Sequence, residues 1–157
     1  MADVLILVGS ESDKPRIEPA FEILTKAGFS YEFYASSAHR QPEQTGDLVK
    51  NARKKGFKVV IAGAGLSAAL PGFAASLTDL PVIGVPFAVG PLNGLDALLA
   101  TVQVPPGVPV ATVGIDNAKN AAHLAIRILK GLSAFRRVRP SLEPIQSTSP
   151  GHTPRPV

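Results

Sequence analysis

The chain of 157 residues contains no cysteine and no tryptophan. Without cysteine the protein has no disulfide, no thiolate nucleophile and no zinc site built on sulfur ligands. Histidine, which occurs three times, is therefore the residue type to examine for proton transfer near neutral pH. No pair of these histidines has the short spacing of metal ligands, so the sequence predicts no metal, and it predicts no other cofactor.

Long apolar runs are missing too. No stretch approaches the roughly 18 consecutive apolar residues that a membrane span needs, and the N-terminus lacks the basic segment and cleavage site of a signal peptide. We therefore expect a cytoplasmic protein that does not act on a membrane. The chain length and the apolar fraction of 45% are typical of one globular domain with a substantial core.

Most of the net positive charge lies at one end of the chain. Residues 134–157 contain four arginines and one glutamate, so this segment carries +3 of the net charge of +4 and the other 133 residues are close to neutral. Aromatic residues, on which bases would stack, make up only 6% of the chain. A near-neutral body with a basic tail does not form a basic groove, so we predict no binding to nucleic acid.

Short apolar segments alternate with helical patterns along the chain. The predicted strands cover residues 3–9, 29–35, 57–62, 81–87 and 110–113. The predicted helices cover residues 13–27, 42–55, 67–77, 92–103 and 117–132. Ser12 or Asp13 is the expected N-cap of the first helix, and Pro71-Gly72 is expected to interrupt the third.

Five strands alternating with five helices predict a parallel sheet with helices on both faces. Because the crossovers are right-handed, this is an α/β, flavodoxin-like three-layer sandwich. We assign residues 1–133 to this single domain. Residues 134–157, rich in proline and arginine, form a predicted tail that packs on a neighbouring subunit. Ligands of such folds bind at the carboxyl ends of the strands.

His39 and Arg40 follow the second predicted strand, at such a carboxyl end. A histidine there can act as a general acid or base, and a neighbouring arginine can hold a phosphate with two parallel hydrogen bonds. The alternative is a surface histidine beside an arginine at a helix entry. His123, within the last predicted helix, and His152, in the tail, are interpreted as structural or solvated.

Two further loops carry candidate ligand-binding groups. Residues 10–13 (Ser-Glu-Ser-Asp) precede the first predicted helix, where free N–H groups and hydroxyls could hold a phosphate or a ribose. Asp13 would repel a phosphate, so ribose is its expected partner. Gly63-Ala64-Gly65 lets backbone N–H groups approach a carboxylate or CO2. Each segment also has a simpler interpretation: residues 10–13 as a helix cap, and Gly63-Ala64-Gly65 as an ordinary turn.

Several motifs occur together in the order of one enzyme family. They are Gly9-Ser10-Glu11-Ser12-Asp13, Ser37-Ala38-His39-Arg40-Gln41-Pro42, Ala62-Gly63-Ala64-Gly65, Leu70-Pro71-Gly72, residues 81–86, Leu92-Asn93-Gly94-Leu95-Asp96 and Val102-Gln103-Val104-Pro105. Over residues 3–130 the chain closely resembles the N5-carboxyaminoimidazole ribonucleotide mutases, also known as the catalytic subunit of phosphoribosylaminoimidazole carboxylase. The resemblance implies an enzyme of purine biosynthesis, a small aminoimidazole ribonucleotide as substrate, and a homo-octamer with sites between neighbouring subunits.

The resemblance also implies roles for individual residues. His39 would be the general acid/base that moves a proton while CO2 passes from the exocyclic nitrogen to ring carbon C4. Arg40 and Ser10 would hold the phosphate, Asp13 the ribose, and Gly63, Ala64 and Gly65 the migrating CO2. Ser12 and Ser37 complete the expected substrate-binding set.

The chain departs from the family pattern in the third loop. The family reads Gly-Ala-Gly-Gly-Ala-Ala-His-Leu-Pro-Gly, and this chain has Ala69 at the histidine position. Val89 stands where the family has serine. The related animal-type carboxylases, which use free CO2, also lack that histidine but have lysine in place of Arg40. Two alternatives to the mutase are therefore open: a carboxylase that uses CO2, or a ribonucleotide-binding homologue with little activity.

Overall fold

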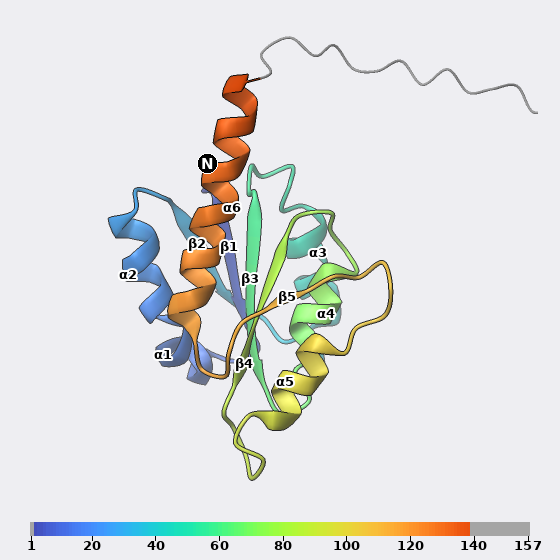
Figure 1. The fold of residues 1–157 in the computed structure, drawn as a ribbon. Coiled ribbons are helices and arrows are strands. Elements are labelled where there is room, and N and C mark those ends of the chain that lie inside the picture. The colour runs from blue at the N-terminus through green and yellow to red at the C-terminus, as the bar shows by residue number, and fades with distance from the viewer. Residues whose placement is uncertain (1, 139–157) are drawn as a thin grey trace, which may run out of the picture.

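The computed structural model describes residues 2–138 as one α/β unit (Figure 1). Its strands are β1 (Val4–Val8), β2 (Tyr31–Ala35), β3 (Val59–Gly65), β4 (Val82–Phe87) and β5 (Ala111–Thr112). Its helices are η1 (Glu11–Asp13), a 3-10 turn, and α1 (Lys14–Ile17), α2 (Pro19–Lys26), α3 (Pro42–Lys50), α4 (Ala69–Ala75), α5 (Leu95–Val102) and α6 (Ala118–Val138). The strands pair in parallel in the order β2-β1-β3-β4-β5, which is the flavodoxin-like order.

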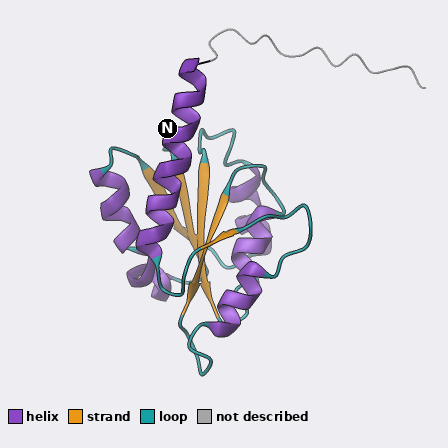
Figure 2. Ribbon diagram, in the orientation of Figure 1, coloured by secondary structure: helices purple, strands orange, loops and turns teal. Residues whose placement is uncertain are grey.

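Helices cover both faces of the sheet, which makes the predicted three-layer sandwich (Figures 1 and 2). Alternate residues of β1 belong to the cores on opposite faces of the sheet. Val4, Ile6 and Val8 belong to the core under α1, α2 and α6. Leu5 and Leu7 belong to the core under α3, α4 and α5. All five β1 residues are buried, as expected for a strand read from a continuous aliphatic run.

The first predicted helix is divided into three short pieces. Ser10, not Ser12 or Asp13, provides the capping side chain, because its hydroxyl accepts a hydrogen bond from the Ser12 N–H. Asp13 precedes α1 but makes no side-chain cap. Pro19 begins α2, since proline lacks an N–H and suits the first helical turn.

Two other helix predictions also need correction. α4 runs through Pro71 and Gly72 without interruption, because Pro71 is its third residue and N–H groups in the first turn have no intrahelical partner. α6 continues to Val138, beyond the expected end at residue 132 and past the start of the predicted tail. Residues 139–157, which make up most of that tail and include His152, lie outside the described part of the chain.

The apolar side of α5 is exposed in the single chain. Leu95 is 53% exposed, and Leu99 and Val102 are each 49% exposed. The helix packs on the sheet through Ala97 and Thr101 instead. Leucine and valine at spacings of three and four residues form one stripe on a helix, so α5 presents an apolar surface that the described chain does not cover.

Within residues 2–138, no helix is both long enough and apolar enough to cross a bilayer.

Candidate active site

A cavity of about 270 Å³ opens where the carboxyl ends of β1, β2 and β3 meet. This is the point in the strand order at which the chain reverses direction across the sheet, where ligands of such folds bind. Loops that are distant in the sequence supply its lining: Gly9, Ser10, Asp13, Ser37, Ala38, His39, Arg40, Ala64, Gly65, Ser67, Ala68, Ala69 and Leu70.

The loop after β2 places His39 and Arg40 at the rim, where both are exposed. Ser37 closes the loop into a turn: its hydroxyl accepts from the Arg40 N–H at 3.2 Å, and its carbonyl accepts from the Gln41 N–H at 2.8 Å. The Arg40 guanidinium donates through Nη2 to the Gly9 carbonyl at 3.1 Å. Arg40 therefore joins this loop to the one after β1 and keeps other N–H groups for a ligand.

A buried pair of hydroxyls anchors this loop from below. Ser36 Oγ and Thr45 Oγ1 lie 2.7 Å apart, and Thr45 Oγ1 also donates to the Gln41 carbonyl at 2.8 Å. The Ser36 N–H donates to the Val8 carbonyl at 2.8 Å, which extends the pairing of β1 and β2 by one residue. Hydrogen bonds therefore hold both ends of the segment that carries His39.

The loop after β1 contributes Ser10 and Asp13. Ser10 Oγ and Ser12 Oγ lie 2.9 Å apart, and Ser12 itself does not line the cavity. Partial burial raises the pKa of the Asp13 carboxyl above its ordinary value, while Arg16, the backbone of Ser10 and Arg40 act in the opposite direction. Asp13 thus lies in the field of two arginines, where a neutral hydroxyl ligand can approach it.

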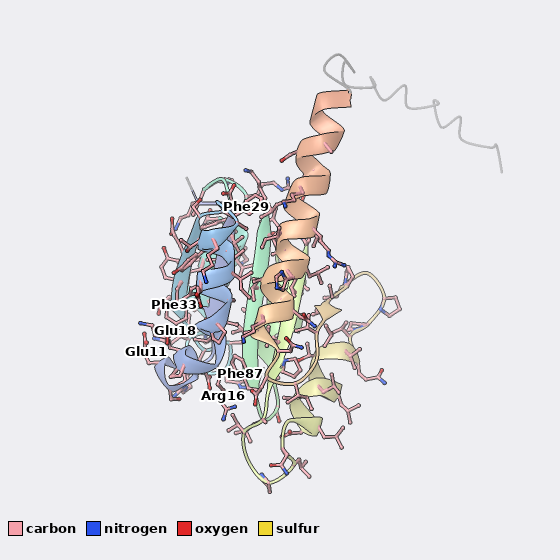
Figure 3. All side chains as sticks on the ribbon, turned by 60° about the vertical axis from the view of Figure 1, so that its left-hand side comes forward. Glu11, Arg16, Glu18, Phe29, Phe33 and Phe87 are labelled. Carbon is pink, nitrogen blue, oxygen red and sulfur yellow. The ribbon has the colours of Figure 1, made fainter. Side chains whose placement is uncertain are left out.

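Arg16, on α1 just after this loop, is hydrogen-bonded across the carboxyl end of the sheet. Its Nη1 donates to both carboxylate oxygens of Asp116, at 2.9 Å each, and Asp116 Oδ1 also accepts from the Ala88 N–H at 3.2 Å. Figure 3 shows Arg16 and Phe87 at this end of the molecule and Phe29 at the opposite end. α1 is therefore joined to the loops after β4 and β5.

The β3 wall is built by close packing. Gly63 lies within β3, paired with Val8 and Val85, and does not line the cavity. A Cβ at Gly63 would lie 2.3 Å from Cζ of the fully buried Phe87 ring. A Cβ at Gly65 would lie 2.7 Å from Cγ2 of Val89. Gly63 therefore makes room for an aromatic ring, and Gly65 lets the loop after β4 approach.

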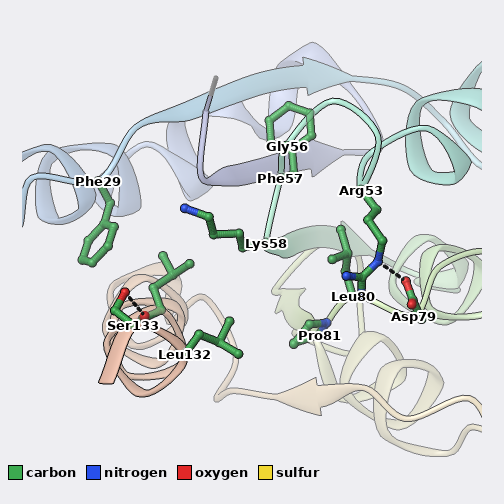
Figure 4. Close-up of a pocket in the computed structure, with 11 residues that line it drawn as sticks. Phe29, Arg53, Gly56, Phe57, Lys58, Asp79, Leu80, Pro81, Leu132 and Ser133 are labelled. Carbon is green, nitrogen blue, oxygen red and sulfur yellow. Dashed lines mark hydrogen bonds and ion pairs between the residues drawn. The ribbon is translucent and has the colours of Figure 1, made fainter. Parts of the chain in front are cut away.

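A larger hollow of about 520 Å³ lies at the amino ends of the strands, beside α6 (Figure 4). Its aromatic and aliphatic lining includes Phe29, Leu80 and Leu132. The Arg53 guanidinium there is engaged at 2.7 Å by Asp79. The lining contains no histidine, so the smaller cavity, which holds His39, is the better candidate for proton transfer. Among residues 2–138 no group of three or more acidic or histidine side chains is placed to hold a metal ion.

The sequence matches known proteins over most of its length. A sequence profile of the family described as AIR carboxylase, where AIR denotes aminoimidazole ribonucleotide, matches residues 3–147. The chain is 57% identical over 124 residues to the N5-carboxyaminoimidazole ribonucleotide mutase of Pyrococcus horikoshii, covering 79% of this chain and 70% of that protein. The enzyme of the same name from Saccharolobus solfataricus is 56% identical over 129 residues, with 82% of each chain covered. The chain belongs to the AIR carboxylase family.

Solved structures of this family share the fold. The PurE protein of Treponema denticola is 28% identical and superimposes with a TM-score of 0.72, over 87% of this chain and 90% of that one. A variant of the PurE2 protein from the same organism gives a TM-score of 0.73 at 27% identity, covering 89% and 92%. The flavodoxin-like fold predicted from the sequence is thereby confirmed.

Most of the residues predicted for the site meet in one cavity. The residues brought together are Ser10, Asp13, Ser37, His39, Arg40, Ala64 and Gly65. Ser12 and Gly63 lie beside the cavity without lining it. The sequence analysis missed Ser67, because a serine among small apolar residues resembles an ordinary helix start. Its position two residues after Gly65 was the one signal that could have found it.

The two residues that the sequence analysis singled out in the loops after β3 and β4, Ala69 and Val89, lie at the same wall. Ala69 lines the cavity and is exposed. Val89 packs against Gly65. His123 lies on α6, where it is exposed, and the cavity lining does not include it.

Proposed function

We propose that this protein is an N5-carboxyaminoimidazole ribonucleotide mutase of purine biosynthesis. The observation that supports this most strongly is His39, exposed at the rim of the cavity beside Arg40, Ser10 and Asp13, in a chain that is more than half identical to mutases of that name. The reaction moves a carboxyl group within one nucleotide, so it needs a proton-transfer group and a closed site rather than a cofactor.

His39 acts as acid and then as base in this mechanism. The bond between the exocyclic nitrogen and the carboxyl carbon breaks, CO2 forms, and the nitrogen takes a proton from the His39 imidazolium. The ring electrons then attack CO2 to form a bond from C4, and the neutral imidazole removes the C4 proton. The histidine ends in its starting state, and the overall reaction is an isomerisation with no added reagent.

Different parts of the substrate contact the two walls of the cavity. Arg40 and Ser10 hold the phosphate, since the guanidinium and hydroxyl both donate hydrogen bonds. Asp13 accepts from the ribose hydroxyls, and Ser12 and Ser37 support the two loops that do so. Ala64 and Gly65 line the space for CO2, while Gly63 acts indirectly by seating Phe87. CO2 must be kept from water, because escape ends the reaction without product.

A second candidate is an aminoimidazole ribonucleotide carboxylase that takes free CO2. Ala69 on the β3 wall favours it, because the related animal-type carboxylases also lack the histidine at this position. Arg40 favours the mutase, since lysine stands there in those carboxylases. A ribonucleotide-binding homologue with little activity is the third possibility.

One assay separates these candidates. The purified protein is supplied with the N5-carboxylated nucleotide and, separately, with the unsubstituted nucleotide plus bicarbonate, and formation of the 4-carboxy nucleotide is followed. The mutase converts the first substrate directly and the carboxylase the second. Nucleotide binding with no product from either substrate would contradict both enzyme assignments.

We further propose that the protein forms a homo-octamer whose contacts include the apolar stripe of α5. Leu95, Leu99 and Val102 are half exposed in the single chain, and such a stripe gains stability when a neighbouring subunit covers it. Light scattering should give about eight times the chain mass of 16.4 kDa, and a monomer mass would contradict the octamer.

Residues 134–157 are proposed to pack on a neighbour, and their deletion should lower the oligomer mass or its melting temperature. The cytoplasmic location stays a prediction.

A further inference from the structure

The β3 wall of the cavity offers a ligand only one side chain that can form hydrogen bonds. Its members are Ala64, Gly65, Ser67, Ala68, Ala69 and Leu70, and among them only Ser67 has a polar side chain. The facing wall, from the loops after β1 and β2, carries Ser10, Asp13, His39 and Arg40. A carboxylate held against the β3 wall therefore has one side-chain donor available from that wall.

A tight turn fixes the backbone around Ser67. The Ala68 N–H donates to the Leu66 carbonyl at 2.8 Å, and the Ala69 N–H donates to the Ser67 carbonyl at 2.6 Å. Leu66 adopts a left-handed conformation with φ of 54°, which is uncommon for a residue with a side chain and is often found at functional sites. The turn starts at Leu66 and leads into α4, so Ser67 has little backbone freedom.

Ser67 lines the cavity and is exposed to solvent. Ser67 and Ala69 are exposed, whereas Ala68 between them is fully buried. Serine hydroxyls in turns often bond to nearby backbone groups, but within residues 2–138 no hydrogen bond engages the Ser67 hydroxyl, unlike those of Ser10, Ser36 and Ser37. A ligand can therefore use it without breaking an internal bond.

We propose that Ser67 Oγ donates a hydrogen bond to the migrating carboxyl group and so is a substrate-binding residue of this enzyme. This inference rests on the proposed mutase or carboxylase function. A carboxylate against an apolar wall is costly without a donor, and a hydroxyl donor to a carboxylate forms a short, strong bond. Once the group has become neutral CO2, it needs no donor and can pack against the small apolar side chains of Ala64, Ala68 and Ala69.

Ala69 lies two positions after Ser67 on the same wall of the cavity, and its methyl group cannot form a hydrogen bond. The hydroxyl of Ser67 thus supplies a donor that Ala69 cannot.

The test compares Ser67→Ala with Ser133→Ala in the full-length protein. Ser133 is an exposed serine at the opposite end of the molecule, so it is the matched control. We expect Ser67→Ala to lower kcat/KM for the 4-carboxy nucleotide-forming reaction by roughly 10- to 100-fold, the usual effect of losing a hydrogen bond to a charged group. A larger share of each turnover should end as unsubstituted nucleotide plus CO2. Ser133→Ala should change neither quantity.

Two further variants separate binding from a structural effect. Ser67→Thr keeps the hydroxyl and should retain most of the activity, and Ala69→His added to Ser67→Ala should recover part of what was lost. Equal melting temperatures for all variants would show that folding is intact. Unchanged kinetics and an unchanged ratio of released CO2 to product in Ser67→Ala would overturn the proposal.

A binding measurement keeps the Ser67 proposal testable even if the proposed activity fails. Calorimetry compares the 4-carboxy nucleotide with the unsubstituted nucleotide as ligands. The wild-type protein should prefer the carboxylated ligand, and Ser67→Ala should lose roughly 10-fold or more of that preference. An equal preference in both proteins would count against Ser67, whereas an absence of turnover in the wild type would count against the proposed function alone.

Discussion

The two walls of the cavity are held in place by different forces. Hydrogen bonds hold the wall that carries His39: Arg40 reaches the Gly9 carbonyl, and the buried hydroxyls of Ser36 and Thr45 anchor the loop. Close packing holds the β3 wall, where Gly63 makes room for the Phe87 ring and Gly65 for Val89. One wall is polar and exposed at its rim, while the other is apolar except for Ser67 and is supported by a buried ring.

Because of this difference, we expect one wall to matter mainly for chemistry and binding and the packing under the other to matter mainly for stability. Directed hydrogen bonds fix the orientation of a proton-transfer group and of phosphate-binding groups, which catalysis requires. Close packing at Gly63 and Gly65 fixes the position of the β3 backbone, because a side chain there would collide with Phe87 or Val89. Substitutions on the polar wall should therefore affect chemistry and binding, and substitutions beneath the apolar wall should affect stability first.

The largest effect is expected from His39→Asn. Asparagine keeps a polar side chain of similar size but cannot exchange a proton, so kcat should fall about 10²- to 10⁴-fold, with nucleotide binding largely retained. Single-turnover assays and calorimetry measure the two quantities. His123→Asn, on α6 away from the cavity, is the control and should leave both unchanged. Normal turnover by His39→Asn would remove this residue from the mechanism.

Gly63→Ala tests whether the β3 wall depends on the close packing of Gly63 against Phe87. The added methyl group would lie 2.3 Å from the Phe87 ring, which is fully buried, so the free energy of unfolding should fall by about 3 kcal/mol. Gly131→Ala is the matched control, because nothing lies within 4 Å of its added Cβ and alanine favours a helix. Denaturant unfolding measures both variants. Equal stability of Gly63→Ala and wild type would show that the wall does not depend on this contact.

Thr45→Val tests the anchor of the polar wall. Valine fills the same space but leaves the buried Ser36 hydroxyl without its partner, so the free energy of unfolding should fall by about 1–2 kcal/mol. Thr101→Val is the control, since among the described residues the equally buried Thr101 hydroxyl bonds only to the Ala97 carbonyl of its own helix. If the two variants lose the same stability, the hydroxyl pair has no special role in holding the loop.

Asp13→Asn should give the smallest effect and the one that depends on pH. Because burial raises the pKa of Asp13 in the folded protein above its ordinary value of 3.8, the ionised carboxylate weakens folding once the pH exceeds that range. The variant should therefore be slightly more stable at pH 7, by up to about 0.5 kcal/mol, and the gain should vanish near pH 3, where the carboxyl is protonated in both states. Nucleotide affinity should fall at pH 7. A stability difference that persists at low pH would rule out this cause.

The polar wall could be predicted from the sequence because its residues are unusual for their positions. His39, Arg40 and Asp13 follow apolar strands, and strand ends of a parallel sheet converge at one edge. The apolar wall could not be predicted in the same way. Gly63 resembles a ligand-binding glycine, and only the position of Phe87, 24 residues later in the chain, shows that it accommodates a ring.

Local sequence rules also failed where tertiary packing decided the outcome. The sequence predicts a helix over residues 92–103 but not which of its sides packs on the sheet. The side that packs carries Ala97 and Thr101 and not the leucines, because small side chains let the helix approach closely. The capping group of the first helical segment is Ser10, since the chain turns into a 3-10 helix before α1 begins.

The sequence by itself determined the fold class, the order of elements and the polar half of the site. Periodicity and strand-end chemistry are local properties, and they are readable without coordinates. Tertiary structure alone decided which glycine faces the cavity, which side of α5 is exposed, and that Ser67 lies with His39 around one cavity. These outcomes depend on contacts between segments far apart in the chain, and no local pattern encodes such distances.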